Sequence, residues 1–208
     1  MNAASRQAHW EKVYASKREN EVSWFQENPA PSLDLIAKAA ATTASSVIDV
    51  GGGASRLVDA LIENGFRAVT VLDLSNAALM AAKARLGSRA EQVQWVVADV
   101  TEWEPHGLAY DTWHDRAAFH FLIEEPDRMA YVARLIKAVK PGGHAIICTF
   151  APDGPERCSG LPVVRYDAAA ISKILGPSFD LLQSRIHAHQ TPTGVIQRFQ
   201  FSRFRRLN

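Results

Sequence analysis

The chain has 208 residues and a formal net charge of +1, with 47% hydrophobic and 22% charged residues. These values are ordinary for a soluble globular protein and predict a single domain with a full core. The charge offers no general attraction to nucleic acid or to an anionic membrane, and no segment approaches the ~20 apolar residues of a membrane span. The two cysteines lack CxxC spacing and the start lacks a signal-peptide core, so a reducing, cytoplasmic setting is expected.

Aromatic residues gather near the start of the chain. Residues 5–28 carry Trp10, Tyr14 and Trp24 among many charged side chains, which predicts a helical extension. Two interpretations of residues 1–42 remain open. The extension either packs onto the domain as a structural element, or it forms a lid over a ligand site with its aromatic side chains on the ligand side.

Amphipathic and apolar segments alternate in the next part of the chain. Ser32 is expected to cap a helix that runs to about residue 41. The expected strands are 47–50, 68–73, 93–98, 110–114 and 144–150, and the expected helices are 55–64, 75–87 and 126–139. Near-continuous apolar strands between helices predict a parallel sheet covered on both faces, in three α/β/α layers.

The end of the chain has a different pattern. A helix is expected over residues 167–175, followed by two long alternating segments, 179–189 and 194–204, around a Pro/Gly turn. Such a pair predicts an antiparallel hairpin. The predicted fold is therefore a doubly wound, seven-stranded α/β sheet, mostly parallel, with a C-terminal antiparallel β-hairpin and an N-terminal helical extension.

A glycine-rich turn follows the first apolar strand. Asp49 lies near the end of this strand, and Gly51, Gly52 and Gly53 come directly before an amphipathic helix. Glycines let the backbone turn sharply and approach a ligand, because no Cβ stands in the way. A glycine turn alone is a weak signal, since it also serves to pack a helix on a sheet.

Two further acids lie at the ends of the next strands, at the same edge of the predicted sheet. In a doubly wound sheet this edge is where ligands bind. Asp73 is placed to accept hydrogen bonds from both ribose hydroxyls. Asp99 is placed to accept from an adenine amine, with Val100 contributing a neighbouring backbone N–H. Together with Asp49, these acids predict a nucleoside ligand.

The kind of nucleoside depends on the residues after the glycines. A dinucleotide fingerprint requires a third glycine where this chain has Arg56, which disfavours NAD. The stretch instead resembles motif I of the class I S-adenosylmethionine-dependent methyltransferases, acid-x-G-x-G-x-G. Asp49, Gly51 and Gly53 match this motif, and Ser55 replaces its last glycine.

The resemblance continues along the chain, over about residues 45–150. The segments similar to the later motifs of the family are 71–75, 97–100, 110–114 and 135–143. The resemblance implies one methyltransferase domain over residues 1–208, with S-adenosylmethionine as cofactor and S-adenosylhomocysteine as product. In this division, residues 45–150 bind the cofactor and residues 151–208 form an acceptor-side loop, the last helix and the hairpin. The residues expected to contact the cofactor are Asp49, Gly51, Gly52, Gly53, Ser55, Asp73, Leu74, Asp99, Val100 and His114.

The segment 113–122 is unusually rich in polar side chains for its place beyond the fourth strand. His114 or His120 is a candidate general base, with Asp115 orienting it, and Arg116 is a candidate for holding an acidic acceptor. The alternative is that His114 packs beside the methionine part of the cofactor and that Asp115 and Arg116 form an internal ion pair. The sequence leaves both interpretations open.

Two later stretches have features that bear on function. In the loop 150–166, Arg157 and Arg165 are candidates for clamping a carboxylate or phosphate, and Cys158 is either a reactive thiol or, more often for a lone cysteine, inert. His187 and His189 share one strand face, but no third ligand is evident. No metal is expected.

These features together predict an S-adenosylmethionine-dependent methyltransferase that acts on a small molecule. A protein lysine methyltransferase is the alternative within the family. An NAD-dependent oxidoreductase and a non-catalytic nucleoside-binding protein are the alternatives of other classes. We expect neither nucleic acid nor a membrane as a partner, and a monomer or weak homodimer.

Overall fold

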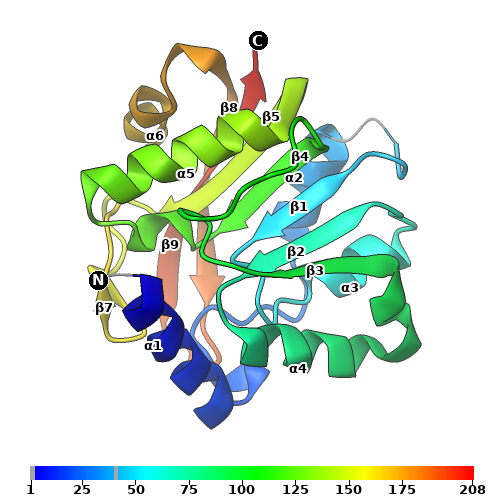
Figure 1. Cartoon of the computed structure of the whole chain (residues 1–208). Helices are drawn as coiled ribbons and strands as arrows, with labels where there is room; N and C mark the ends of the chain where they lie inside the picture. Colours follow the sequence, from blue (N-terminus) through cyan, green and yellow to red (C-terminus); the bar gives the residue numbers. More distant parts are fainter. Residues whose placement is uncertain (1–2, 40–41) are drawn as a thin grey trace.

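The computed structural model describes residues 3–39 and 42–208 and contains a seven-stranded sheet with helices on both faces (Figure 1). The strand order is β3-β2-β1-β4-β5-β9-β8. The strands are β1 (Val47–Val50), β2 (Val69–Asp73), β3 (Val93–Val97), β4 (Tyr110–Arg116), β5 (Val139–Phe150), β8 (Phe179–Gln190) and β9 (Ile196–Arg206). The first five pair in parallel, and β9 is antiparallel to both β5 and β8. The predicted sheet and its terminal hairpin are confirmed.

All the helices after the first bury apolar side chains against this sheet, whereas the first packs against the fourth. The helices are α1 (Ala3–Ser16), α2 (Ala30–Ala39), α3 (Leu57–Glu63), α4 (Asn76–Leu86), α5 (Glu125–Ala138) and α6 (Ala168–Leu175), with 3₁₀ turns η1 (Glu19–Glu21), η2 (Gly87–Gln92), η3 (Phe119–Phe121) and η4 (Gly176–Ser178). One core cluster joins the sheet to α5 and α6 around Trp113 and Tyr131. The other joins it to α2, α3 and α4 around Leu35, Leu61 and Leu79. This division produces the expected three layers.

The central strand β4 sends successive side chains to opposite layers, as any strand does. His114 points toward α2, where its Nε2 lies 2.9 Å from Ser32 Oγ. Asp115 points toward α5, where Tyr131 donates to it at 2.8 Å. Neighbours in the sequence therefore belong to different surroundings.

The N-terminal extension differs from the expected long helix. α1 ends at Ser16, and the chain then continues through η1 and irregular backbone to α2. Contacts with separate parts of the domain hold this irregular stretch, so tertiary structure outweighs its local helix preference. α2 begins at Ala30 and includes Pro31. A proline is tolerated there, because the first turn of a helix does not need its backbone N–H. Ser32 is therefore inside the helix and is not its cap, while residues 40–41 of the expected helix lie outside the described residues.

The region around β5 also differs from expectation. β5 begins at Val139 rather than 144, and its pairing with β4 shifts in register between Tyr110 and Thr112. This irregularity accommodates Pro141 and the two glycines after it within the strand. The loop after β5 contains a short hairpin, β6 (Arg157–Cys158) with β7 (Leu161–Pro162), that the sequence pattern did not indicate.

Candidate functional site

The glycine turn after β1 brings backbone close to its neighbours in a way that other residues do not allow. Gly51 and Gly53 have φ values of +66° and +48°, which favour glycine. A Cβ at Gly51 would lie 2.5 Å from Ala118 Cβ, and one at Gly52 would lie 2.5 Å from Asp49 Oδ2. The turn therefore forms a cradle with no side chains at the carboxyl ends of β1, β2 and β4.

Asp73 is a buried carboxylate at the end of β2. Its Oδ1 accepts a hydrogen bond from the Ser75 backbone N–H at 2.8 Å, and the Gly53 N–H also points to this carboxylate. Burial raises the pKa of Asp73 to about 7 against these hydrogen bonds, and the negative charges of Asp49 and Glu11 add to the rise. Hydroxyl groups of a ligand that donate hydrogen bonds to this carboxylate would therefore stabilise its ionised form.

Asp99, after β3, is already engaged by the N-terminal helix. Its Oδ1 accepts from the Thr101 N–H at 2.9 Å and from Thr101 Oγ1 at 2.7 Å. Arg6 Nε donates to Oδ2 at 2.9 Å, and Arg6 also bonds Asp127 and Thr101. Arg6 therefore links α1 to the two segments on either side of this end of the sheet.

His114 is fixed beneath the glycine turn. Its Nδ1 lies 2.7 Å from Asp49 Oδ1 and its Nε2 lies 2.9 Å from Ser32 Oγ, and all three side chains are buried. Because a carboxylate only accepts, Nδ1 carries a proton and donates to Asp49. The expectation that Asp115 orients His114 is wrong, since Asp49 has that place. His114 supports the turn from below.

Asp115 holds the wall of the site in place from the opposite layer. It is fully buried and accepts from the Ala118 and Phe119 N–H groups and from the Tyr131 hydroxyl. Burial raises its pKa to about 6, although these hydrogen bonds oppose the rise. The alternative of an Asp115–Arg116 ion pair is also wrong, since these successive side chains of β4 point in opposite directions.

We expect Tyr131→Phe to lower the free energy of unfolding by about 1–3 kcal/mol, because Asp115 loses a donor and the Trp113 indole N–H loses its acceptor at 2.8 Å. Urea unfolding at neutral pH measures the change. Tyr110→Phe is the matched control, whose loss should stay within about 0.5 kcal/mol since its hydroxyl is not in this network. Equal losses in the two variants would contradict the role of the network.

His120 is also buried, but elsewhere. Its Nδ1 accepts from the Phe150 N–H at 3.3 Å, and its ring packs against the rings of Phe121 and Phe150. Burial lowers its pKa to about 3. It lines neither of the two cavities described next, so the arrangement favours a packing role over that of a general base.

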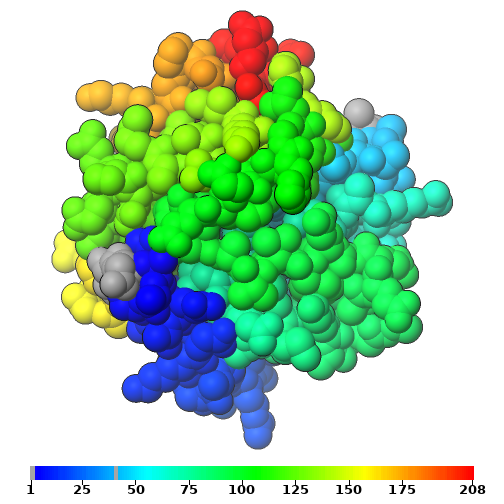
Figure 2. All heavy atoms as spheres, viewed as in Figure 1, coloured from blue at the N-terminus to red at the C-terminus, as the bar shows by residue number. Residues whose placement is uncertain are grey.

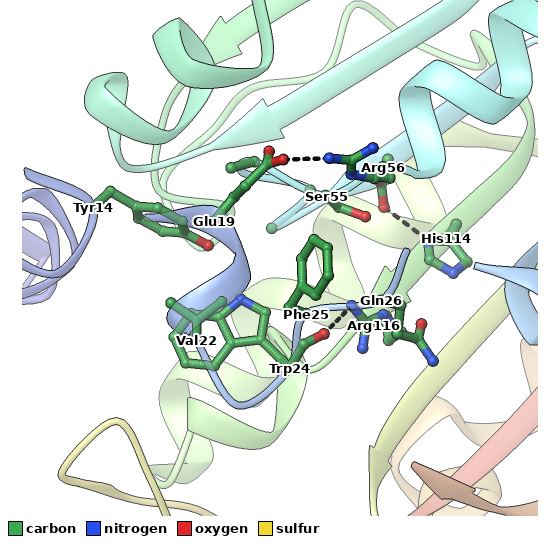
Figure 3. A pocket seen from close by; sticks show the side chains of 14 residues that line it. Tyr14, Glu19, Val22, Trp24, Phe25, Gln26, Ser55, Arg56, His114 and Arg116 are labelled. Carbon is green, nitrogen blue, oxygen red and sulfur yellow. Dashed lines mark hydrogen bonds and ion pairs between the residues drawn. The ribbon is translucent and has the colours of Figure 1, made fainter. Parts of the chain in front are cut away.

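Two adjoining cavities lie over the glycine turn. The first has a volume of about 500 Å³ and includes Asp49, Ser55 and His114 in its lining (Figure 3). The second, of about 710 Å³, includes Asp73 and Asp99. The residues that line both cavities, and so separate them, are Tyr14, Trp24, Gly51 and Arg116.

The second cavity has two unlike ends. One end carries the residues expected at the nucleoside, which are Asp73, Leu74, Asp99 and Val100. The other end is aromatic, since Trp10 lies 5.6 Å from Trp24 and 5.0 Å from Phe121 between ring centroids. Cys158 also lines this end. The expected acceptor-side residues Trp10, Tyr14 and Trp24 are thus brought together with the expected cofactor residues.

The two arginines of the loop after β5 are not in this group. Arg157 is exposed and donates to the Gly160 carbonyl, and Arg165 bonds Glu156 at 3.0 Å. Neither lines the two cavities, so a clamp by this pair is not formed. Burial raises the pKa of Cys158 to about 11, which makes a reactive thiol unfavourable.

The N-terminal segment covers the site and is tied down by charges. Glu11 accepts from the Asn76 and Ala77 N–H groups at the start of α4, where a helix dipole favours an anion. Glu19 pairs with Arg56 and Arg85 on the other side. Figure 2 shows the segment in blue between the yellow atoms of the loop after β5 and the green atoms near α4. The segment packs on the domain and contributes side chains to the lining of both cavities, while its action as a lid stays a prediction.

Three contributors to the site were missed in the sequence, namely Arg6, Ser32 and Phe121. Arg6 had a usable signal, because it lies four residues before Trp10 and eight before Tyr14, on one helix face. Ser32 and Phe121 had none, since their positions depend on how α2 and η3 meet the sheet.

The described residues contain neither a metal-binding cluster nor a membrane-spanning helix. Among the described residues, no group of three or more His, Cys, Asp or Glu side chains is arranged to hold a metal ion. His189, one of the two histidines on β8, instead bonds the Ser23 carbonyl at 2.7 Å. No helix in the described ranges is both long and apolar enough to cross a bilayer.

The comparisons with known proteins agree on the class of protein. Residues 47–143 match the family model described as a methyltransferase domain. No curated protein sequence matches the chain. The strand order and the glycine turn, together with this match, define a class I methyltransferase fold.

Several solved structures share the fold. The N-methyltransferase NodS from Bradyrhizobium japonicum WM9, in complex with S-adenosyl-L-homocysteine, has a TM-score of 0.72 and 16% identity over 95% of this chain and 98% of its own. The 1,6-didemethyltoxoflavin-N1-methyltransferase of Burkholderia thailandensis has a TM-score of 0.70 and 21% identity, over 99% of this chain and 85% of its own. A structure from work on the conversion of a disulfide bond into a thioacetal group during echinomycin biosynthesis has a TM-score of 0.76 and 20% identity, over 95% of this chain and 90% of its own. The chain thus has the fold of the class I S-adenosylmethionine-dependent methyltransferases, which is the fold that its motifs predicted.

Proposed function

We propose that the protein transfers the methyl group of S-adenosylmethionine to a small molecule held at the aromatic end of the second cavity. The observation that carries the proposal is this cavity itself, in which Asp73 and Asp99 lie at one end and Trp10, Trp24 and Phe121 at the other. A cofactor and an acceptor bound at these ends would share one enclosed space. NodS and the toxoflavin enzyme, which have the same fold, are methyltransferases whose names refer to nitrogen as the methylated atom.

The residues present fit the cofactor. Asp73 is buried and has its pKa raised by isolation, and ribose hydroxyls would supply the donors it lacks. The glycine turn leaves room that a Cβ would fill. In the proposed arrangement Asp73 holds the ribose, Asp99 accepts from the adenine amine, and Ser55 lies near the methionine carboxylate in the first cavity. The cofactor supplies an electrophilic methyl group on a sulfonium.

The protein's own contribution is positioning and the exclusion of water. Transfer is an in-line displacement, so the acceptor atom must lie close to the methyl and opposite the bond that breaks. The four residues that line both cavities, Tyr14, Trp24, Gly51 and Arg116, lie where the two cavities adjoin. The N-terminal segment contributes Tyr14 and Trp24 to the lining of both cavities.

The enclosure favours a small acceptor over the side chain of a folded protein. A lysine methyltransferase needs a channel that admits a peptide, whereas here α1 and the residues after it cover the aromatic end. The oxidoreductase alternative has no support from the family match.

We expect calorimetric titration to detect S-adenosylhomocysteine binding in the micromolar range and no binding of NADH. Asp73 and the glycine turn form a site for one nucleoside, and Arg56 replaces the glycine that a dinucleotide requires. A screen of metabolite extract for products heavier by one methylene group then tests the acceptor class. Tight NADH binding without S-adenosylhomocysteine binding, or methylation confined to the protein fraction, would overturn the proposal.

A further inference from the structure

Arg116 is the charged residue at the boundary between the two cavities. It lies at the end of β4 and lines both cavities, and its Nη2 donates to the Trp24 carbonyl at 2.8 Å (Figure 3). Burial lowers its pKa, because a desolvated cation is disfavoured, while the Asp49 and Tyr14 groups oppose this. In the described ranges no carboxylate forms an ion pair with it. Its remaining N–H groups can therefore serve an anionic ligand.

The aromatic end of the second cavity contains no general base among the described residues. Cys158 has its pKa raised to about 11 by burial, with a hydrogen bond to Ser23 opposing the rise. Burial and the Asp73 charge also raise the pKa of Tyr14, so its phenol stays protonated at neutral pH. Both side chains are neutral there, and neither can remove a proton from an acceptor.

The remaining candidates for a base are all engaged or distant. Asp73 and Asp99 lie at the nucleoside end, and Asp99 is paired with Arg6. His114 is held between Asp49 and Ser32, and its ring lines only the first cavity. An acceptor at the aromatic end must therefore be a nucleophile before it binds.

We propose that the acceptor is an aromatic thiol that binds as its thiolate beside Arg116, against the wall formed by the contacting rings of Trp10, Trp24 and Phe121. The inference rests on the proposed function and specifies its substrate class. Among thiols, alcohols and phenols, a thiol ionises most readily near neutral pH, since free cysteine has a pKa of ~8.5. Alcohols and most phenols stay protonated, and alkyl amines are already protonated. Aryl rings suit the aromatic walls.

A carboxylate is the competing anion, and the lining disfavours it. A carboxylate brings two strongly hydrated oxygens that each require donors, whereas the described lining at this end offers one guanidinium, the Tyr14 hydroxyl and the Cys158 thiol among otherwise apolar groups. A thiolate brings a single, weakly hydrated sulfur. One cation in apolar surroundings is matched to that acceptor.

The step balances without any proton transfer. A lone pair of the thiolate sulfur forms the new S–CH₃ bond while the bond from the methyl to the sulfonium sulfur breaks. The electron pair of the broken bond stays on that sulfur and yields neutral S-adenosylhomocysteine. The negative charge of the acceptor and the positive charge of the sulfonium cancel, and the thiol proton has already gone to solvent.

The first test compares four probes of one shape: thiophenol, phenol, aniline and benzoate. Formation of S-adenosylhomocysteine at saturating cofactor measures the rate for each. We expect kcat/KM for thiophenol to exceed that of the other three by at least about 100-fold, a difference of about 3 kcal/mol in activation free energy. A higher value for phenol, aniline or benzoate, or no turnover of thiophenol, would overturn the inference.

The second test measures binding without turnover. The ultraviolet absorbance of thiophenolate follows the ionisation of thiophenol bound to the complex of the protein with S-adenosylhomocysteine. Arg116 should lower the ionisation midpoint of the bound thiol by about one pH unit relative to free thiophenol. The titratable and charged groups that line the second cavity as a whole are Arg6, Tyr14, Asp73, Asp99, Arg116 and Cys158.

Three variants assign the shift to the Arg116 charge. Arg116→Lys should keep most of it, and Arg116→Gln should abolish it. Arg157→Gln removes an exposed arginine of the loop after β5 and should leave it unchanged. If the shift persists in Arg116→Gln, the Arg116 charge does not cause it and the inference fails. The inference also fails if thiophenol bound to the wild-type protein shows no shift while Arg116→Gln weakens the binding of S-adenosylhomocysteine, because Arg116 then serves another group. Failure of the wild type to bind S-adenosylhomocysteine would instead refute the proposed function.

Discussion

Asp73→Asn is expected to weaken S-adenosylhomocysteine binding by about 100-fold or more. Two ribose hydroxyls lose a charged acceptor, and hydrogen bonds to charged groups contribute about 1.5–3 kcal/mol each. Asparagine keeps the shape of the side chain, but its amide nitrogen cannot accept a hydrogen bond. Calorimetric titration at pH 8, where the wild-type carboxyl is ionised, measures the change.

The same residue predicts a pH dependence of binding. The pKa of Asp73 is about 7 in the ligand-free protein, so the carboxyl is protonated at lower pH. Because the ribose hydroxyls favour the ionised form, the dissociation constant of the wild type should rise about tenfold per pH unit below about pH 7. The Asn variant should lack this dependence. A wild-type dissociation constant that stays constant from pH 8 to pH 6 would contradict the assignment.

As pH rises, the stability of the ligand-free protein should fall, whereas its affinity for S-adenosylhomocysteine should increase. The pKa of Asp73 in the folded protein lies above the ordinary value of 3.8 for this group, so the native state holds a proton that the unfolded state loses between about pH 4 and pH 7. The free energy of unfolding therefore falls as pH rises through that window, and the buried charge is fully unfavourable above it. Ligand-free Asp73→Asn should be more stable than wild type at pH 8 by up to about 4 kcal/mol.

A matched acid separates this effect from the loss of any carboxylate. Asp111 lies at the other end of the sheet, where it pairs with Lys140 at 2.9 Å and accepts from Ser46. Asp111→Asn should leave S-adenosylhomocysteine binding unchanged and should lower stability slightly. If both variants weaken binding equally, the effect is on the fold and not on the ribose site.

The parts of the fold that the sequence predicted are those set by local pattern. The apolar run of β1 and the three glycines after it specify a buried strand and a sharp turn in any setting. The acids Asp73 and Asp99 were placed correctly at one edge because parallel strands end together. Pattern and topology together were sufficient for the cofactor end of the second cavity.

The partners of individual side chains were harder to predict, and two cases differ in kind. His114 and Asp115 were grouped because they are adjacent, although the alternation of a strand sends them to opposite layers. That error was avoidable from the sequence. The pairing of Arg6 with Asp99 joins residues far apart in the chain, at 2.9 Å, and depends on where α1 crosses the sheet. No local pattern contains that information.

The extension illustrates the same limit. Its aromatic residues indicated a lid or a packing element, and the structure shows the packing, while the lid stays a prediction. The charged residues that tie it down, Glu11 and Glu19, act on α4, Arg56 and Arg85. In the sequence they read only as a solvated surface, since opposite charges are common on any exposed helix. Their role follows from tertiary contacts alone.

Gly51→Ala is expected to lower the free energy of unfolding by about 3 kcal/mol or more and to abolish cofactor binding. Two separate effects add. The φ of +66° is unfavourable for a residue with a Cβ, by about 1–2 kcal/mol, and the new Cβ would lie 2.5 Å from Ala118 Cβ. The neighbour cannot move freely, because Asp115 holds the Ala118 N–H at 2.9 Å. Urea unfolding measures the stability and calorimetric titration with S-adenosylhomocysteine measures binding.

Two further variants separate the clash from the backbone strain. Gly194→Ala, in the β8–β9 turn, has a φ of +84° and open space around the position, so it should show the strain alone. Gly51→Ala combined with Ala118→Gly removes the clashing atom and should return stability to about the level of Gly194→Ala, although the second substitution would add backbone flexibility of its own. If stability does not recover in the double variant, backbone strain and not the close approach to Ala118 after β4 causes the loss of stability in Gly51→Ala. With recovery of stability but not of binding, Gly51 is required because its backbone faces the cofactor, which is the role that the glycine turn has in this fold.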